Sequence, residues 1–361
     1  MKILWFNHRD LFHPEAGGAE LRLHEVAKRL CRDGFGVKLY CERWANSKKE
    51  ELVDGIEINR IADKFTIHLK VPFILNSTNY DVVIDDISHA IPWFSPLFTT
   101  KPVICQIHHL HQDVVFREFP YPYAKIIQTI ERSIPHVYQN FITVSESSKK
   151  ALINKFGIDE NRIKIIYNGV TVERLKTTEK NPYPTLVWIG RMKRYKRIEH
   201  VLMSYKIVEK RIPASRLFVI GDGDYYSAIK NLAGKLNLHN VVFTGKINET
   251  EKNTLISQAW ALVNTSAVEG WGNTVIEGAA YGTPTIAYYV EGLKDSIQNG
   301  KTGILVENGN IVALANAIID LLEDDTLRYN LSKKSLENSK KYDWETTVSE
   351  FENVLKRETN D

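Results

Sequence analysis

The sequence has few cysteines, no long apolar run and almost no net charge. Its three cysteines, Cys31, Cys41 and Cys105, lie far apart among 361 residues, and none has a second cysteine at metal-ligand spacing. That pattern excludes a disulfide framework and a cysteine-based metal site. We therefore expect buried thiols in a reducing compartment.

Long apolar runs are absent as well. No segment reaches the roughly 18 apolar residues of a membrane-spanning helix. The apolar stretch at the N-terminus, Ile3 to Phe6, is too short for the core of a signal peptide. These absences predict a cytoplasmic protein, with a peripheral contact at the inner face of the membrane left open.

Charge of one sign is also lacking. Lysine and arginine number 47 against 44 acidic residues, a formal net charge of +3, and each half of the chain is close to neutral. A nucleic-acid-binding protein needs a concentrated cationic face, so we expect no nucleic-acid partner. With 43% hydrophobic and 25% charged residues the composition is average for soluble globular proteins, which excludes disordered and coiled-coil classes.

Length and periodicity predict an α/β fold with two domains. A chain of 361 residues is too long for one core, and short apolar runs alternate with segments of helical period, as in βαβ units. The first series of strands is expected at 2–6, 36–41, 81–84, 103–107 and 141–144, with a helix over 20–31. The second is expected at 185–190, 217–221, 241–245, 261–264, 285–287 and 303–306, with helices beginning near Arg197, Tyr225, Thr250, Thr274 and Ile311.

A polar stretch over 177–184 predicts the junction, so the domains are expected at 1–176 and 177–343. Two tandem Rossmann-like domains facing across a cleft would bind a ligand between the carboxyl ends of their sheets. Candidate functional residues are therefore sought at strand ends.

The segment 269–277 carries two glutamates eight positions apart. If Asn273 or Thr274 caps a helix, the first glutamate lies in the preceding loop and the second points inward from the first turn. Gly270 and Gly272 would let backbone amides approach an anion at the helix N-terminus. This pattern suits a phosphorylated polyol, and the alternative is one solvated loop acid and one acid favoured by the helix dipole.

A basic loop over 190–196 follows the first strand of the second series. Arg191 and Lys196 can both reach one diphosphate, the arginine as a bidentate donor and the lysine as a point charge. A solvated run of charges is the alternative.

Two features of the first half lie at strand ends. Gly17 and Gly18 precede a helix and suit a phosphate-approach loop, but without the G-x-G-x-x-G spacing of a dinucleotide site, and a plain turn is the alternative. His108 begins a group of histidines after the strand 103–107. His111 has no carboxylate partner at defined spacing, so we expect one hydrogen-bonding histidine and no metal site.

Aromatic, proline and isoleucine residues are frequent over 91–98, 116–123 and 126–134. If these segments are exposed, they form an apolar acceptor groove or a membrane-surface contact for a lipid-linked sugar. If they are buried, they belong to the core.

Taken together, these segments resemble the retaining glycosyltransferases of family 4, which have the glycosyltransferase B fold and transfer a sugar from a nucleotide diphosphate donor. The segments that match occur in the family's order, at 14–20, 103–108, 144–146, 167–170, 190–196, 219–223, 269–277 and 282–284. The resemblance also implies that a last helix, over about 344–361, packs back on the first domain.

The resemblance implies roles for individual residues. Glu269 matches the acid that holds donor sugar hydroxyls, and Glu277 the acid that binds the ribose. Arg191 and Lys196 match the pair that neutralises the diphosphate, and His108 matches a histidine that contacts the sugar. The implied donor-binding residues are Gly17, Gly18, Gly190, Gly270, Trp271, Gly272, Asn273, Thr274, Val275 and Glu277.

Three departures from the family pattern concern the donor. Trp271 replaces the usual Phe, Arg197 stands where Gly often follows the lysine, and Val290 with Glu291 replaces a Gly-rich sugar loop. The donor therefore remains open between GDP-linked and UDP-linked hexoses.

The reaction implied is same-face substitution, with Arg191, Lys196 and helix amides facing the charge that grows on the leaving phosphate. It needs no metal cofactor, and the acceptor would be a glycan or a lipid-linked sugar. Two rival functions stay open: an NAD-dependent tandem-Rossmann oxidoreductase or epimerase, and a non-catalytic carbohydrate-binding module.

Overall fold

The computed structural model describes residues 1–64, 66–112, 115–171 and 179–360. It contains two compact units, one of Met1–Gly169 with Trp344–Asp361 and one of Val170–Asp343. The chain therefore passes between units after Gly169 and returns at Trp344, whereas the boundary expected at 176/177 lies outside the described residues.

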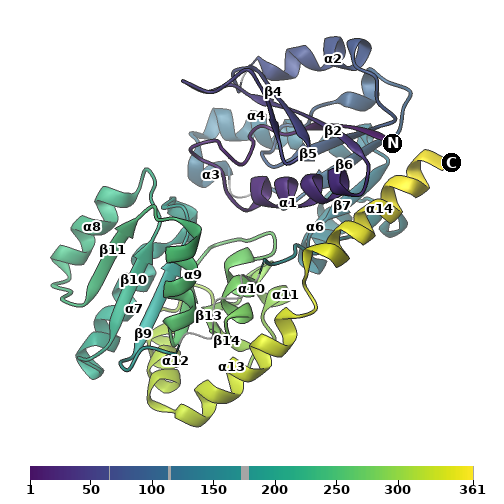
Figure 1. Ribbon diagram of the computed structural model, residues 1–361. Helices are drawn as coiled ribbons and strands as arrows, with labels where there is room; N and C mark the ends of the chain where they lie inside the picture. Colours follow the sequence, from purple (N-terminus) through teal and green to yellow (C-terminus); the bar gives the residue numbers. More distant parts are fainter. Residues whose placement is uncertain (65, 113–114, 172–178, 361) are drawn as a thin grey trace. The chain divides into compact units, whose positions relative to one another are not determined.

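The first unit is built on an eight-stranded sheet in the order β3-β4-β2-β1-β5-β6-β7-β8 (Figure 1). Neighbouring strands are parallel except β3 and β4, which are antiparallel. The strands are β1 (Lys2–Phe6), β2 (Gly36–Glu42), β3 (Glu50–Val53), β4 (Ile56–Ala62), β5 (Val82–Ile87), β6 (Val103–Ile107), β7 (Asn140–Thr143) and β8 (Ile163–Ile165). The α-helices are α1 (Gly18–Arg32), α2 (Val71–Ser77), α3 (Val115–Glu118), α4 (Tyr121–Glu131), α5 (Ile134–Val137), α6 (Glu146–Phe156) and α14 (Trp344–Asn360).

The second unit has a six-stranded parallel sheet in the order β11-β10-β9-β12-β13-β14. Its strands are β9 (Thr185–Ile189), β10 (Arg216–Ile220), β11 (Val241–Gly245), β12 (Ala261–Asn264), β13 (Thr285–Tyr288) and β14 (Gly303–Val306). Its helices are α7 (Ile198–Arg211), α8 (Tyr226–Lys235), α9 (Glu249–Gln258), α10 (Asn273–Ala280), α11 (Leu293–Ser296), α12 (Ile311–Glu323) and α13 (Asp325–Ser339).

Each sheet reverses its strand order at one place, between β1 and β5 in the first unit and between β9 and β12 in the second. In open α/β sheets the connections leaving such a switch point diverge to opposite faces, and ligands bind beside the carboxyl ends of the two strands. The loops after these four strands therefore hold the candidate sites.

The predicted fold class, two Rossmann-like α/β domains, is confirmed. Buried central strands such as β1 and β6 have the predicted bounds because both of their faces are covered and their apolar runs are continuous. The hairpin of β3 and β4 was not predicted. Its edge strand, Glu50–Val53, carries two glutamates and alternates exposed and half-buried positions, so it lacks that apolar signal.

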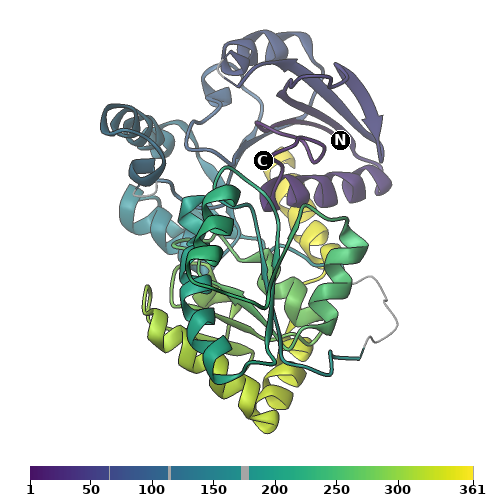
Figure 2. The same cartoon turned by 90° about the vertical axis from the view of Figure 1, so that its left-hand side faces the viewer.

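Helix α14 completes the core of the first unit. Phe351 stacks on Trp5 of β1 with ring centroids 5.5 Å apart, and both side chains are fully buried. At the start of the helix, hydrogen bonds from Arg32 and Arg29 of α1 lower the pKa of Glu345 to about 2. The two helices lie side by side (Figures 1 and 2), as the resemblance implied for this segment.

Truncating Phe351 to Ala should lower the free energy of unfolding by about 3–5 kcal/mol, because the change leaves a cavity against Trp5. Chemical denaturation followed by tryptophan fluorescence measures the loss. Ser349→Ala, at an exposed position of the same helix, is the control and should stay within about 0.5 kcal/mol of the native protein. Equal stability of the two variants would contradict the packing role of α14.

Candidate functional site

The switch point of the second sheet brings a lysine and a glutamate together. Lys196 lies in the loop after β9 and Glu269 in the loop after β12, and Lys196 Nζ is 2.5 Å from Glu269 Oε1. Ser266 Oγ donates to the same oxygen at 2.7 Å. Burial alone would lower the pKa of Lys196, but the Glu269 carboxylate outweighs burial and raises it. Lys196 is therefore held as a cation at the sheet's ligand-binding edge.

Arg191 lies close to this pair, since its charge acts to lower the pKa of Lys196. The other cations of the loop have partners elsewhere. Lys193 pairs with Asp224, and the Arg194 guanidinium lies 5.9 Å from the ring centre of Tyr225. Of the basic run, Arg191 is thus the residue whose charge acts on Lys196.

The backbone conformation of Arg197 is one that glycine adopts more easily, and glycine often stands at this position in the family that the sequence resembles. Arg197 has a φ of 48°, in the left-handed region where side chains other than glycine's are strained by about 1–2 kcal/mol. Two interactions hold it there. Thr265 Oγ1 donates to the carbonyls of Lys196 and Arg197 at 3.0 and 2.9 Å, and the guanidinium donates to Asn308 Oδ1 at 2.7 Å.

Helix α10 begins differently from the prediction. We expected Asn273 or Thr274 to cap it, but the N-cap is Gly272, which has a φ of 82° and provides no side-chain cap. Asn273 and Thr274 are the first two residues of the helix, so neither can be its N-cap. The N-cap residue of α10 therefore supplies no side-chain acceptor to the first turn, and a helix N-terminus of this kind suits the approach of an anionic ligand.

Glu277 is in the second turn of α10 and not in the first, and its side chain is 16% exposed. Lys252 of α9 lies beside it, with Nζ 3.3 Å from Glu277 Oε2 and 2.7 Å from Glu249 Oε2. Burial alone would lower the pKa of Lys252, but the Glu277 and Glu249 carboxylates raise it. No sequence pattern links Lys252 to Glu277, so the sequence did not predict that Lys252 lies beside this glutamate.

The loop after β13 fits closely against Glu269. Gly292 has a φ of 79°, and a Cβ at this position would lie 2.2 Å from the carbonyl oxygen of Glu269. The backbone N–H of Glu269 donates to the carbonyl of Glu291 at 3.3 Å. Trp271 is buried and packs edge-on against Tyr342 at 5.0 Å. These contacts fix the backbone that carries the glutamate.

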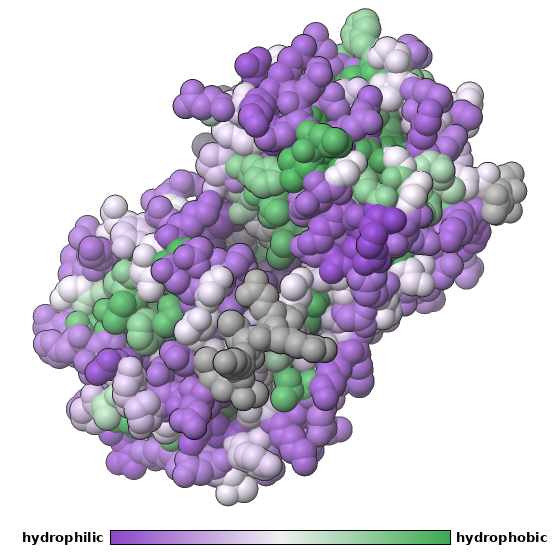
Figure 3. Space-filling model, in the orientation of Figure 1, coloured by the Kyte–Doolittle hydropathy of each residue, from purple (hydrophilic) through white to green (hydrophobic). Residues whose placement is uncertain are grey.

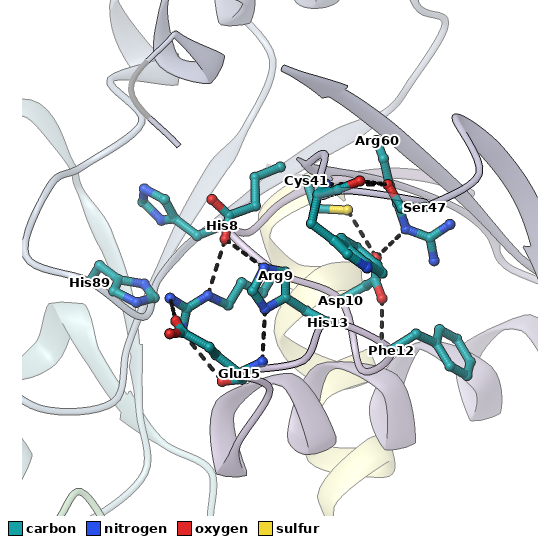
Figure 4. A network of polar contacts seen from close by, with 12 residues as sticks. His8, Arg9, Asp10, Phe12, His13, Glu15, Cys41, Ser47, Arg60 and His89 are labelled. Atoms are coloured by element: carbon teal, nitrogen blue, oxygen red, sulfur yellow. Dashed lines mark hydrogen bonds and ion pairs between the residues drawn. The ribbon is translucent and has the colours of Figure 1, made fainter. Parts of the chain in front are cut away.

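In the first unit, the loop after β1 leads to Gly17 and Gly18 and is held by ion pairs (Figure 4). Arg9 bonds Glu42 at 3.1 Å and also pairs with Glu15. Asp10 accepts a hydrogen bond from the buried Arg60 at 2.6 Å. The loop is therefore anchored to β2 and β4 on its way to α1.

Gly17 is the N-cap of α1, and its backbone N–H donates to Glu20 Oε2 at 2.7 Å. Gly18 is the first residue of the helix. The acceptor for this N–H is thus supplied three residues into the helix, as in a capping box.

His108 follows β6, and its Nε2 lies 2.9 Å from Asp86 Oδ1. His111 has no carboxylate partner at defined sequence spacing, but the fold supplies one, since His111 Nδ1 is 3.3 Å from Glu131 Oε1 of α4, twenty residues later. Sequence spacing could not show this contact because the fold creates it. Within the described ranges, no three histidine, cysteine, aspartate or glutamate side chains form a group able to hold a metal ion.

The apolar segments of the first unit divide between core and surface. Trp93 and Ile134 are fully buried and belong to the core. Around α4, several large apolar side chains are exposed, and a shallow apolar groove runs along that helix. The exposed residues are Phe116, Phe119, Tyr121, Tyr123 and Ile126, and the groove is lined by Tyr121, Pro122, Lys125, Ile126, Thr129 and Ile130.

On the face drawn in Figure 3, green apolar patches interrupt the hydrophilic surface of both units. Among the helices that the structure describes, none combines the length and apolar character needed to cross a membrane.

Known proteins resemble the chain along nearly its full length. An uncharacterized glycosyltransferase of Methanocaldococcus jannaschii is 25% identical and is covered over 96% of both chains. Among solved structures, a sucrose-phosphate synthase from Thermosynechococcus elongatus has a TM-score of 0.81 at 20% identity, with 99% of this chain and 98% of that one covered. The Anabaena protein HepE, solved with UDP-glucose, has a TM-score of 0.79 at 18% identity, with 99% and 100% covered.

Two family models match the sequence in succession. The model described as Glycosyltransferase Family 4 matches residues 16–174, and the model described as Glycosyl transferases group 1 matches residues 170–338. The second model contains the Lys196 and Glu269 pair and Glu277, and the first contains Gly17, Gly18 and His108. The chain therefore belongs to the group 1, family 4 glycosyltransferases, with the glycosyltransferase B fold.

Proposed function

We propose that the protein is a retaining hexosyltransferase that uses a UDP-linked or GDP-linked sugar and transfers it to a glycan or a lipid-linked acceptor. The observation that carries this proposal is the contact of Lys196 with Glu269, with Arg191 nearby, at the switch point of the second sheet. Two cations and one carboxylate at this edge suit a ligand that joins a diphosphate to a polyol.

Different parts of the donor would contact different residues of this site, according to their charge. Arg191 and Lys196 bind the diphosphate, Glu269 accepts hydrogen bonds from sugar hydroxyls, and Glu277 accepts them from the ribose. The amides at residues 270–275, including the N-terminus of α10, face the phosphate and the sugar. In the structure Lys196 and Glu269 satisfy each other, so donor binding exchanges their mutual contact for contacts to phosphate and hydroxyls.

The proposed reaction breaks the bond between the anomeric carbon and the β-phosphate oxygen and forms a bond from that carbon to the acceptor oxygen on the same face. The acceptor's proton passes to the departing phosphate. Negative charge grows on that phosphate in the oxocarbenium-like transition state, where Arg191 and Lys196 stabilise it. The proposal gives this task to the two cations and assigns no metal ion to it.

We further propose that the exposed apolar surface of α4 serves the acceptor side and makes a peripheral contact with the membrane at its inner face. Phe119, Tyr121 and Ile126 are 50%, 70% and 57% exposed. An apolar helix face of this kind inserts at the boundary of headgroups and acyl chains. A lipid-linked acceptor would then be reached where it is embedded.

Donor binding is tested by thermal unfolding with UDP, GDP, ADP and NAD. A UDP or GDP sugar at about 100 times its Kd should raise the Tm by roughly 5 °C or more, and NAD should not change it. Glu277→Gln should reduce the shift, because a neutral amide oxygen accepts hydrogen bonds from the ribose more weakly than a carboxylate and the second oxygen is replaced by a donor. The control is Glu249→Gln, which alters the other carboxylate bound to Lys252 and should keep the shift. A shift with NAD alone would refute the proposal.

Replacing Lys196 by Ala should lower kcat by about 100-fold to 1,000-fold while the KM for the acceptor changes little, because the cation acts mainly on charge that develops in the transition state. Steady-state kinetics with the donor found above measures both constants. Lys193→Ala is the matched control, since Lys193 is in the same loop but pairs with Asp224, and its kcat should be nearly unchanged. Full turnover by Lys196→Ala would overturn the assignment.

Membrane contact is tested by co-sedimentation with vesicles of phosphatidylethanolamine and phosphatidylglycerol. Replacing Phe119, Tyr121 and Ile126 by Ser should lower the bound fraction at least about tenfold, since each side chain contributes on the order of 1 kcal/mol or more. Trp93 is unsuitable for this test because it is buried. The control replaces exposed Val312 and Tyr329 of the second unit by Ser. Vesicle binding unaffected by the α4 changes would remove the proposal.

A further inference from the structure

We propose that Asp86 is a positioning residue that fixes the ring tautomer of His108 for its contact with the donor sugar. This inference rests on the function proposed above and on the contact with that sugar which the family resemblance implies for His108. Asp86 lies in β5 and is fully buried, and its Oδ1 is 2.9 Å from His108 Nε2.

The second carboxylate oxygen of Asp86 is occupied by other donors. Gln106 Nε2 donates to Oδ2 at 2.6 Å, and Trp5 Nε1 donates to it at 3.4 Å. Gln106 is the register partner of Asp86 across β5 and β6, so the sheet itself sets this contact. Oδ1 is therefore the oxygen directed at His108, and the carboxylate has little freedom to rotate away.

The orientation of Gln106 is also determined by its surroundings. The buried Arg22 donates from Nε to Gln106 Oε1 at 3.3 Å and from a terminal nitrogen to Asn168 Oδ1 at 2.5 Å. An arginine only donates, so the amide oxygen faces Arg22 and the amide nitrogen faces Asp86. The chain of contacts from Arg22 to Asp86 has one consistent set of donors and acceptors.

This chain decides which nitrogen of His108 carries the proton. An aspartate carboxylate only accepts, so Nε2 of His108 is the protonated nitrogen in the neutral ring. Nδ1 is then the ring's acceptor, available to a sugar hydroxyl. The backbone of His108 is held separately, since Ser148 Oγ donates to its carbonyl at 3.0 Å.

The contact of Asp86 with His108 has the same physical effect as the carboxylate partner of a metal-bound or catalytic histidine. In such sites a carboxylate on one ring nitrogen fixes the tautomer and the direction of the other, and loss of that partner costs about 10-fold to 100-fold. In the sequence Asp85 and Asp86 are adjacent and nothing in the pattern distinguishes them. The fold distinguishes them, because Asp85 instead accepts from Ser95 Oγ and Tyr138 Oη, both at 2.7 Å.

The decisive variant is Asp86→Asn. Its amide keeps an oxygen for Gln106 and Trp5 but turns an N–H₂ toward His108, so Nε2 must accept and the proton moves to Nδ1. We expect kcat/KM for the nucleotide sugar to fall about 10-fold to 100-fold. In a His108→Ala background the same change should have no further effect, because Asp86 acts through His108. A loss of equal size in both backgrounds would show a merely structural role and overturn the proposal.

Asp85→Asn is the matched control. It removes one carboxylate oxygen from the same strand at an equally buried position without touching His108, so kcat/KM should stay within about twofold even if Tm falls. Gln106→Met is the second variant, for use if Asp86→Asn does not fold. It keeps the carboxylate but removes one of its donors, and its smaller loss should likewise vanish with His108→Ala.

A spectroscopic measurement separates this inference from the proposed function. In ¹⁵N-histidine NMR, with His108 assigned by its absence in His108→Ala, wild-type His108 should show a protonated Nε2, and Asp86→Asn should show a protonated Nδ1. A protonated Nδ1 and bare Nε2 in the wild-type neutral ring would refute the positioning role. Failure of the wild type to transfer any sugar would instead refute the proposed function, while the NMR result still decides the tautomer.

Discussion

The contact between Lys196 and Glu269 is the interaction on which the proposed donor site depends. Two opposite charges, each about 15% exposed, stabilise one another where β9 and β12 diverge. A half-buried cation without a partner would lose its proton or its position, so the pair preserves the charge that a diphosphate requires. The neighbouring structure maintains this contact: Ser266 bonds the carboxylate, and Gly292 lets the next loop approach the backbone of Glu269.

Pairs of opposite charge also occur elsewhere in the chain. Glu277 has Lys252 beside it, and Arg9 is held between Glu42 and Glu15. Each group thus has a partner of opposite charge before any ligand arrives, so a ligand must compete with an existing contact. Binding energy is then partly used to separate these pairs, which favours ligands that carry both anionic and hydroxyl groups over simple anions.

The first unit differs, because its contacts orient one side chain, the ring of His108. Its means are buried hydrogen bonds whose donors and acceptors are fixed by chemistry, from Arg22 through Gln106 to Asp86 and His108. Buried polar groups are costly unless they are paired, and the pairs formed here allow one arrangement of donors and acceptors. In the second unit the backbone of Arg197 is strained in a left-handed conformation. Hydrogen bonds with Thr265 and Asn308 stabilise that conformation.

The sequence by itself determined the two Rossmann-like domains, the buried central strands and the loops that carry Lys196 and Glu269, because apolar period and strand-end position are local properties. Only the tertiary structure decided that Glu131 pairs with His111, that Lys252 pairs with Glu277 and that Asp86, not Asp85, faces His108. It also decided that Trp93 is buried while Tyr121 and Ile126 of α4 are exposed. These outcomes depend on which helices and strands become neighbours, and contacts between residues distant in sequence leave no periodic signal in the chain.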